Sequence, residues 1–331
     1  MREHFYLLEN QKLRKVDVNI KTLIEQHSQQ ATNSIPDWMI GCFKRRSISF
    51  ASGETDIDTH VFWLQGRNLT IDLRLPIESE MVANQSWEQC PAEALYQLAN
   101  YEGWSAESTW EGNQLSWSGG TSFQIHNRWP EPAILSRVGD CMIEASPFES
   151  YIEDWRIKSR ELGALLSLEL ISEENLTTGE LRHQGGALII NGDWAGLVLG
   201  RSSELELDKH TQLRDHVKQG SADIPFLKQV FNFETSVAKG NLTEGFNINF
   251  STMPTRVGES LFELDGFEFD EENNEVLQFF KEGVQQIKRR FSIDTIEAEF
   301  AYSGTTEWHE KSKKWFDTEQ ETIGRYLQKL T

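Results

Sequence analysis

The sequence is poor in cysteine. Cys42, Cys90 and Cys141 are the three cysteines among 331 residues, and no two of them form a CxxC motif. A sparse, odd-numbered set of this kind argues against a disulfide framework and against a zinc site. We therefore expect no metal site, and we expect the reducing environment of the cytoplasm.

Long apolar segments are absent as well. No stretch approaches the roughly 18 apolar residues that a membrane-spanning helix needs. The chain begins Met1-Arg2-Glu3-His4 and has no apolar region of signal-peptide length after that start, so we expect no signal peptide. Both absences support the expectation of a cytoplasmic protein that has no membrane partner.

Positive charge is in deficit. The chain has 32 lysines and arginines against 52 aspartates and glutamates, a formal net charge of −20. An acidic surface repels phosphate groups, so we expect no nucleic-acid partner. Whether the chain forms homo-oligomers is left open.

Catalytic and cofactor motifs are missing too. The sequence has no GxSxG, no P-loop, no GxGxxG and no HExxH. We therefore predict no cofactor, and no motif identifies the chain as an enzyme.

What the chain does contain is a globular composition with strand-like patterns. Hydrophobic residues make up 38%, and 11 tryptophans are present, so a folded chain long enough for two domains is expected. From residue 69 to residue 75, leucines and an isoleucine alternate with Thr70, Asp72 and Arg74. This period of two is typical of a strand with one buried face.

The order of the segments predicts four regions. They are an N-terminal helical segment and linker (1–35), a first barrel (36–158), a second barrel (159–305) and an amphipathic C-terminal helix (306–331). Inside the second barrel, a helix is predicted from Val276, Leu277, Phe280, Val284 and Ile287. In the C-terminal helix the apolar stripe consists of Trp308, Trp315, Phe316, Ile323, Tyr326, Leu327 and Leu330. We expect this stripe to dock on the rest of the chain, and a partner protein or a second copy is the alternative.

Several ordered motifs resemble a known superfamily. Gly41-Cys42-Phe43 is similar to the glycine-x-aromatic opening of the calycins, the lipocalins and their relatives. The segment from Tyr151 to Trp155 resembles the close of a group of uncharacterised lipocalin-like proteins, and the likeness covers about residues 38–158. It implies a β-barrel with a cavity, often for an apolar ligand. It also implies a basic residue packed across the opening aromatic, a role for which Lys44, Arg45 and Arg46 are the candidates.

The predicted fold class is therefore all-β with accessory helices, built as two tandem antiparallel calycin-like β-barrels plus a C-terminal helix. Whether the two halves are duplicates is left open, because the likeness of residues 61–66 to residues 187–192 is short.

Polar residues on the strands of the first barrel are the candidates for chemistry. Asp72 and Arg74 share a strand face, and they form either an exposed ion pair, the favoured interpretation, or a clamp for a carboxylate. His126 and Arg128 share another face, where a neutral imidazole is a candidate general base.

The other candidate site residues come from the closing motif and the tryptophans. Glu144 and Tyr151 are candidates for acid–base work or for anchoring a polar ligand end. With His126 they make up the catalytic candidates. The full ligand-binding set predicted from the sequence is Trp63, Asp72, Arg74, Trp117, His126, Arg128, Glu144, Tyr151 and Trp155. We expect aromatic residues to dominate the pocket, with at most two of Asp72, Arg74, His126 and Glu144 inside it.

Three functions follow as hypotheses. The favoured one is non-enzymatic binding of a small apolar or aromatic molecule in the barrel cavity. The second is a small-molecule enzyme, an isomerase, lyase or hydrolase, with its site in the first barrel. The third is a scaffold or interaction protein with solid barrels.

Overall fold

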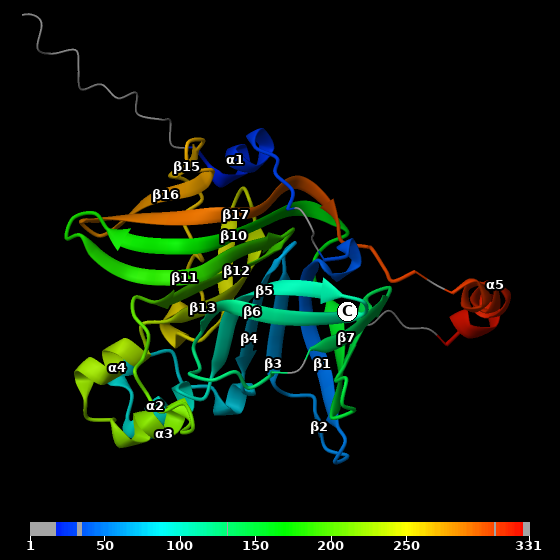
Figure 1. Ribbon diagram of the computed structural model, residues 1–331, viewed down its shortest axis with the longest axis horizontal. Helices are drawn as coiled ribbons and strands as arrows, with labels where there is room; N and C mark the ends of the chain where they lie inside the picture. The colour runs from blue at the N-terminus through cyan, green and yellow to red at the C-terminus, as the bar shows by residue number, and fades with distance from the viewer. Residues whose placement is uncertain (1–17, 32–34, 131, 308, 327–331) are drawn as a thin grey trace, which may run out of the picture.

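The computed structural model describes residues 18–31, 35–130, 132–307 and 309–326, and within them the chain forms two antiparallel β-sheets and five α-helices (Figure 1). The strands of the first sheet are β1 (Gly41–Phe50), β2 (Thr55–Asp56), β3 (His60–Gln65), β4 (Leu69–Leu75), β5 (Glu102–Glu111), β6 (Gln114–Ser122), β7 (Ala133–Val138), β8 (Cys141–Ala145) and β9 (Tyr151–Ile157). The strands of the second sheet are β10 (Leu162–Asn175), β11 (Glu180–Asn191), β12 (Trp194–Arg201), β13 (Glu234–Asn241), β14 (Gly245–Ser251), β15 (Phe267–Asp270), β16 (Glu275–Glu282) and β17 (Gln285–Ala301). The helices are α1 (Ile20–Gln26), α2 (Ala92–Leu98), α3 (Leu213–Gln219), α4 (Ile224–Val230) and α5 (Glu310–Gly324).

The first sheet is a closed barrel. Its strands follow one another as a meander from β1 through β3 to β9, and β9 returns to pair with β1, from Phe43 opposite Ile157 to Phe50 opposite Tyr151. An eight-stranded barrel of this type has room inside for side chains and one small ligand. The predicted first barrel is therefore present as an up-and-down antiparallel barrel.

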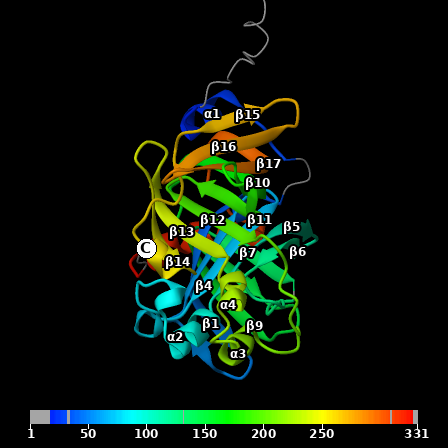
Figure 2. The ribbon, with the colours of Figure 1, turned by 90° about the vertical axis from the view of Figure 1, so that its left-hand side faces the viewer.

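The second half is not a barrel, and the prediction of two tandem barrels is wrong on this point. The spatial order of its strands is β14-β13-β12-β11-β10-β17-β16-β15. The edge strands β14 and β15 do not pair with each other. The chain between them forms a loop and a short 3₁₀ turn in place of a closing strand. The apolar residues of α1 and of this sheet form one cluster of buried side chains. Figure 2 shows α1 next to β15.

The helix predicted across residues 276–287 is also wrong. Val276, Leu277 and Phe280 lie in β16, and Ile287 lies in β17. Gly283 has a φ of +59° in the turn between the two strands, which ends any helical path there. The apolar residues of this segment have helical spacing, but the turn at Gly283 makes the segment a β-hairpin.

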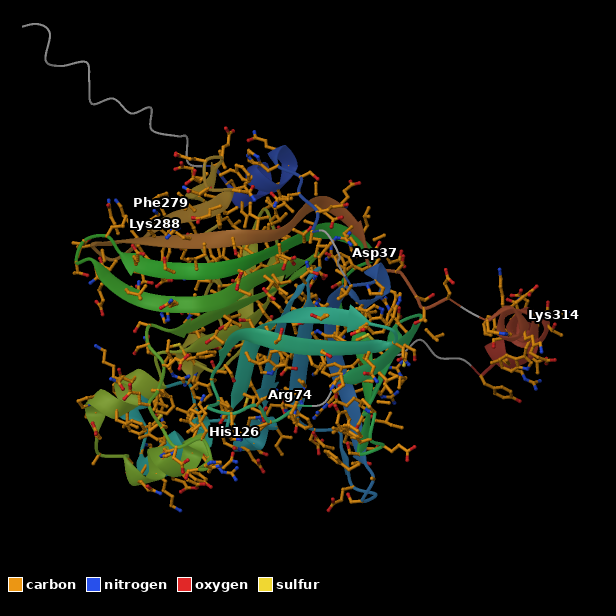
Figure 3. The ribbon with its side chains drawn as sticks, viewed as in Figure 1. Asp37, Arg74, His126, Phe279, Lys288 and Lys314 are labelled. Carbon is orange, nitrogen blue, oxygen red and sulfur yellow. The ribbon has the colours of Figure 1, made fainter. Side chains whose placement is uncertain are left out.

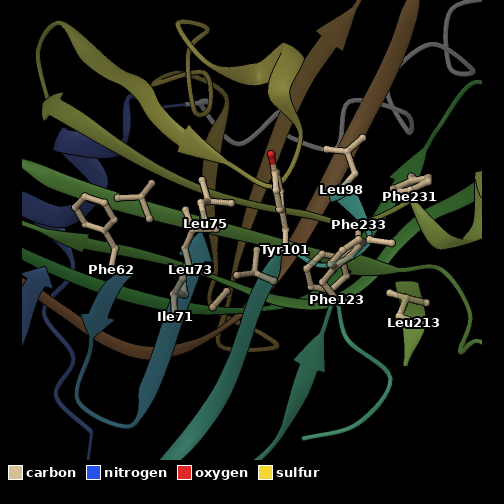
Figure 4. Close-up of a cluster of buried hydrophobic side chains, with 14 of the residues drawn as sticks. Phe62, Ile71, Leu73, Leu75, Leu98, Tyr101, Phe123, Leu213, Phe231 and Phe233 are labelled. Carbon is tan, nitrogen blue, oxygen red and sulfur yellow. The ribbon is translucent and has the colours of Figure 1, made fainter. Parts of the chain in front are cut away.

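The two halves share an apolar layer. The outward face of β3 and β4, including Phe62, Ile71 and Leu73, packs against Ile189 and Val198 of the second sheet. Figure 4 shows part of this cluster. At Gly103 on β5 an added Cβ would lie 2.4 Å from the Thr235 hydroxyl of β13, so glycine permits the close approach of the halves.

This layer determines which side chains enter the barrel. Because the second sheet covers the apolar side of β4, the polar side, with Thr70, Asp72 and Arg74, faces the barrel interior. The expectation of an exposed ion pair at Asp72 and Arg74 is therefore wrong. The apolar side of this strand lies outside the barrel and the polar side lies inside it.

The end of the barrel near the opening motif is closed. Arg137, 1% exposed, donates to the backbone oxygens of Trp38 (3.0 Å), Gly139 (2.9 Å) and Tyr302 (2.6 Å). Its guanidinium lies 5.5 Å from the ring centroid of Phe43. The basic residue expected across the opening aromatic is thus Arg137, which follows it by more than ninety positions.

The three basic residues proposed for that contact have other partners. Lys44 lies outside the barrel, 5.5 Å from the ring of Phe62, and Arg45 points inward to Glu153. Arg46 is half exposed and pairs at 3.8 Å with Asp154. None of the three contacts the Phe43 ring among the interactions of the described residues.

The C-terminal helix extends away from the rest of the molecule (Figure 1). No residue of α5 is buried, and Trp315 is 59% exposed, so the expected docking of the stripe on its own chain is not observed. Trp308, Leu327 and Leu330 of that stripe lie outside the described residues, as do most of residues 1–35. Among the helices that the structure describes, none has the length and apolar character needed to cross a membrane.

Candidate functional site

The barrel encloses a cavity of about 300 Å³. Its wall comes from β3 to β6, β8 and β9, and from the chain after β6 up to Trp129. Figure 3 shows two of its residues, Arg74 and His126, in the same part of the barrel. The cavity wall begins at Trp63, which pairs with Phe43, and extends toward the other end of β1, where Tyr151 pairs with Phe50.

Tryptophans form a continuous aromatic wall. The ring centroid of Trp63 lies 5.9 Å from that of Trp117 and 5.5 Å from that of Trp155. Trp104 extends the cluster, 6.0 Å from Trp117, and Trp129 lies at the other side, 6.0 Å from Tyr151. These edge-to-face contacts fix the rings and leave their faces and edges available to a planar ligand.

An ion pair projects into this aromatic space. The Arg74 Nε donates to Asp72 Oδ1 at 2.9 Å and Nη2 donates to Oδ2 at 3.3 Å. The guanidinium also lies 4.3 Å from the ring of Trp129. Its third nitrogen, Nη1, is buried and has no hydrogen-bond partner. A buried donor without a partner is costly, and Nη1 can donate to an acceptor atom that enters the cavity.

The surroundings shift both pKa values of this pair. Burial raises the pKa of Asp72, and the neighbouring Arg74 opposes that rise without cancelling it. Burial alone would lower the pKa of Arg74, but Asp72, Glu153 and Glu102 together raise it. Arg74 is therefore a permanent cation surrounded by acids.

Two glutamates lie side by side on the cavity wall. Glu144 on β8 and Glu153 on β9 are directly paired in the strand register, and both are nearly inaccessible to solvent. Glu153 accepts from Arg45 Nη1 at 2.8 Å. Glu144 accepts from Trp155 Nε1 at 3.1 Å and contacts the Tyr151 hydroxyl at 3.3 Å.

Burial and the charge of Glu153 raise the pKa of Glu144 well above its ordinary value. Burial, followed by the two glutamates, also raises the pKa of Tyr151. Both shifts favour the protonated forms, and Glu144 is the one of the two groups that ionises more easily.

The chain after β6 supplies the remaining polar groups. Arg128 Nη1 donates to Glu102 at 2.7 Å, and Trp129 Nε1 donates to the other oxygen of Glu102 at 3.1 Å. The Nδ1 atom of His126 is buried without a hydrogen-bond partner. His126 thus offers a second open polar position on the cavity wall.

The structure brings all nine residues of the predicted ligand-binding set to this one cavity. The expectation that at most two of Asp72, Arg74, His126 and Glu144 would lie inside is wrong, since all four line it. Of the catalytic candidates, Glu144 and Tyr151 are in contact, and among the interactions of the described residues His126 contacts neither of them. That these residues bind a ligand stays a prediction.

Sequence reasoning left several wall residues out of the set. Glu102 and Trp104 are two residues apart at the start of β5. Glu153 lies between Tyr151 and Trp155 at the same spacing, so these three side chains share one face of β9. Alternation alone would have placed these side chains on the inward face once Trp155 was placed there. The wall segment from residue 118 to residue 125 carries no such signal, because it bends at Gly119 and Gly120.

A second cavity of about 240 Å³ lies between the barrel and the second half. Its wall is mainly aromatic and apolar, with Trp87, Phe123, Phe231, Phe233 and Met253. No sequence pattern predicted this cavity. Across the residues that the structure describes, no group of three or more histidines, cysteines or acids is arranged to hold a metal ion.

Comparisons of the chain with protein-family models, with curated proteins and with solved structures gave no match.

Proposed function

We propose that the barrel binds one small aromatic molecule in the tryptophan-lined cavity, and that the barrel is of the calycin type. The closed eight-stranded meander, its glycine-x-aromatic start and Arg137 packed over Phe43 support the second part. Gly41 has a φ of +148°, a conformation that explains glycine at the start of the motif.

The observation that carries the first part is the unpartnered Nη1 of Arg74 inside an aromatic cavity. A ligand acceptor at this nitrogen would satisfy a buried donor, while its ring contacts Trp63, Trp104 and Trp117. Pockets for small ligands combine apolar walls with a few fixed polar groups in this way.

The size and charge of the cavity restrict the ligand. A volume of about 300 Å³ is at the lower end of ligand pockets, which favours one or two fused rings over a large macrocycle. The acids Asp72, Glu102 and Glu153 balance the arginines Arg74, Arg128 and Arg45 that contact them. A neutral ligand fits this balance better than a multiply charged one.

Tryptophan fluorescence provides the test. Neutral bicyclic ketones and phenols, aromatic acids, fatty acids and haem are titrated into the protein, and native mass spectrometry counts the bound molecules. We expect the neutral bicyclic compounds to quench and to bind with a stoichiometry of one. Binding of fatty acids or haem alone would contradict the proposed ligand class.

A matched pair of variants locates the site. Asp72→Asn with Arg74→Gln removes both charges of the cavity pair and should weaken binding at least tenfold, since one charged hydrogen bond is lost. Glu275→Gln with Arg290→Gln removes a comparable pair on the second sheet and should leave binding unchanged.

The enzyme hypothesis is favoured by a separate observation, the buried cross-strand pair of Glu144 and Glu153 on the cavity wall. The scaffold hypothesis required solid barrels, and the cavity in the first barrel weighs against it.

A further inference from the structure

Glu144 and Glu153 form an unusual cross-strand pair. They occupy opposite positions on β8 and β9, and both point into the barrel. Side chains at opposite positions of antiparallel strands have Cβ atoms about 4.5–5.5 Å apart, and like charges there repel each other. In a buried site the two carboxyl groups therefore hold a proton between them.

The partners of each glutamate decide where that proton resides. Glu153 contacts a cation, Arg45, whose side chain is itself buried and also pairs with Asp56. Glu144 makes its hydrogen bonds with the neutral groups of Trp155 and Tyr151, and the positive charge of Arg74 only partly offsets the effect of burial and of Glu153 on its pKa. These contacts favour the protonated form of Glu144, whose pKa burial and the neighbouring Glu153 raise.

Both glutamates line the cavity in which the aromatic molecule is proposed to bind. One is then a carboxylic acid and the other a carboxylate, next to each other on one wall. Acid–base enzymes use pairs of carboxyl groups in which different surroundings move the two pKa values apart.

We propose that this barrel catalyses enolisation of an aromatic carbonyl compound, with Glu144 as the acid and Glu153 as the base. The inference rests on the proposed function, because the substrate occupies the same cavity. It names the substrate class as a neutral bicyclic or monocyclic ketone with hydrogen on the carbon next to the carbonyl.

The step balances without any further reactant. Glu144 gives its proton to the carbonyl oxygen, and Glu153 removes a proton from the adjacent carbon. The C–H electron pair becomes the C=C bond of the enol, and the carbonyl π pair forms the new O–H bond. The glutamate pair keeps one proton throughout, now on Glu153, and the reverse step restores the ketone or shifts the double bond.

Arg74 supports this step from β4. Its free Nη1 can donate to the same oxygen while negative charge develops there, which is the role of a fixed donor in an oxyanion site. The charged and titratable groups facing Glu144 are Glu153 and Tyr151 on β9 and Arg74 on β4. Rates should therefore fall as pH rises through the raised pKa of Glu144, when the pair loses its proton.

The test uses 2-indanone, a neutral bicyclic ketone, in deuterium oxide. Nuclear magnetic resonance follows the replacement of its α-hydrogens by deuterium, and tryptophan quenching measures its binding separately. We expect the full-length protein to speed this exchange at least tenfold over buffer. Glu144→Gln should abolish that acceleration and change the dissociation constant less than threefold. Glu107→Gln, on the exposed outer face of β5, should behave like the wild type.

The outcomes separate the inference from the proposed function. Binding of 2-indanone without faster exchange overturns the inference and leaves the proposed binding function intact. Faster exchange that persists in Glu144→Gln, or that does not fall with rising pH, also overturns it. Absence of binding by 2-indanone overturns the inference, and absence of binding by every aromatic probe overturns the proposed function as well.

Discussion

Arg74 and Asp72 lie two residues apart on β4 and form a two-point ion pair inside the barrel, with the arginine stacked on Trp129. The pair is the polar centre of the aromatic cavity. It exists there because the apolar side of β4 is committed to the interface between the halves.

Removing one partner of this pair should destabilise the fold. Arg74→Met leaves the Asp72 carboxylate buried without its cation, a change that typically costs about 3–5 kcal/mol of unfolding free energy. The double variant Asp72→Asn with Arg74→Gln should cost clearly less, because no charge is stranded. Urea denaturation measures both, and equal losses for the two variants would contradict the role given to the pair.

Arg137 should be the most important cation for the stability of the barrel. Arg137→Met removes three hydrogen bonds to buried carbonyl oxygens and the contact with Phe43, so we expect a loss of at least about 3 kcal/mol. Arg46→Met, at a half-exposed position on β1, should change the unfolding free energy by less than about 0.5 kcal/mol. A similar effect of both substitutions would show that the closed end does not depend on Arg137.

The raised pKa of Glu144 predicts how the stability of the fold depends on pH. Glu144 ionises near pH 4.3 in the unfolded chain, but burial and Glu153 raise its folded pKa. Between these two values the folded state binds more protons, so this residue lowers stability as pH rises. The unfolding free energy of Glu144→Gln relative to wild type should therefore increase with pH from about 4.3 upward, by at most about 1.4 kcal/mol per pH unit. A constant difference across this range would place the proton elsewhere.

The C-terminal helix should contribute little to the stability of the two sheets. None of the residues of α5 is buried, so deletion of residues 310–331 should shift the melting temperature by less than about 2 °C. Deletion from residue 305 onward should have a larger effect, since Thr306 exchanges hydrogen bonds with Arg137. Calorimetry compares the two truncations, and a large loss from the shorter deletion would show that α5 docks on its own chain.

The sequence predicted the first barrel because period-two patterns, turn signals and the opening motif agree there. The sequence also pointed to residues that line the cavity, through the closing motif and the tryptophans. It could not show which side of β4 faces inward, because that depends on the second sheet, which packs on the apolar side of Ile71 and Leu73.

Other errors have equally local causes. Residues 276–287 satisfy both helical and strand spacing, and Gly283 resolves the ambiguity only once its turn is seen. The second half has strand patterns like those of the first. Alternation of apolar and polar residues does not show whether the two edge strands of a sheet pair and close a barrel. Arg137 was missed because its contact with Phe43 is between residues distant in the sequence.

The most direct test of the account is to fill the cavity and measure binding. Ala106 on β5 lines the cavity wall and is almost fully buried, so Ala106→Phe should occupy the space without exposing new surface. Native mass spectrometry with 2-indanone and its phenolic analogues should then show one bound molecule on the wild type and none on the variant, with circular dichroism unchanged. Equal binding to both proteins would place the ligand outside the barrel and contradict the central claim.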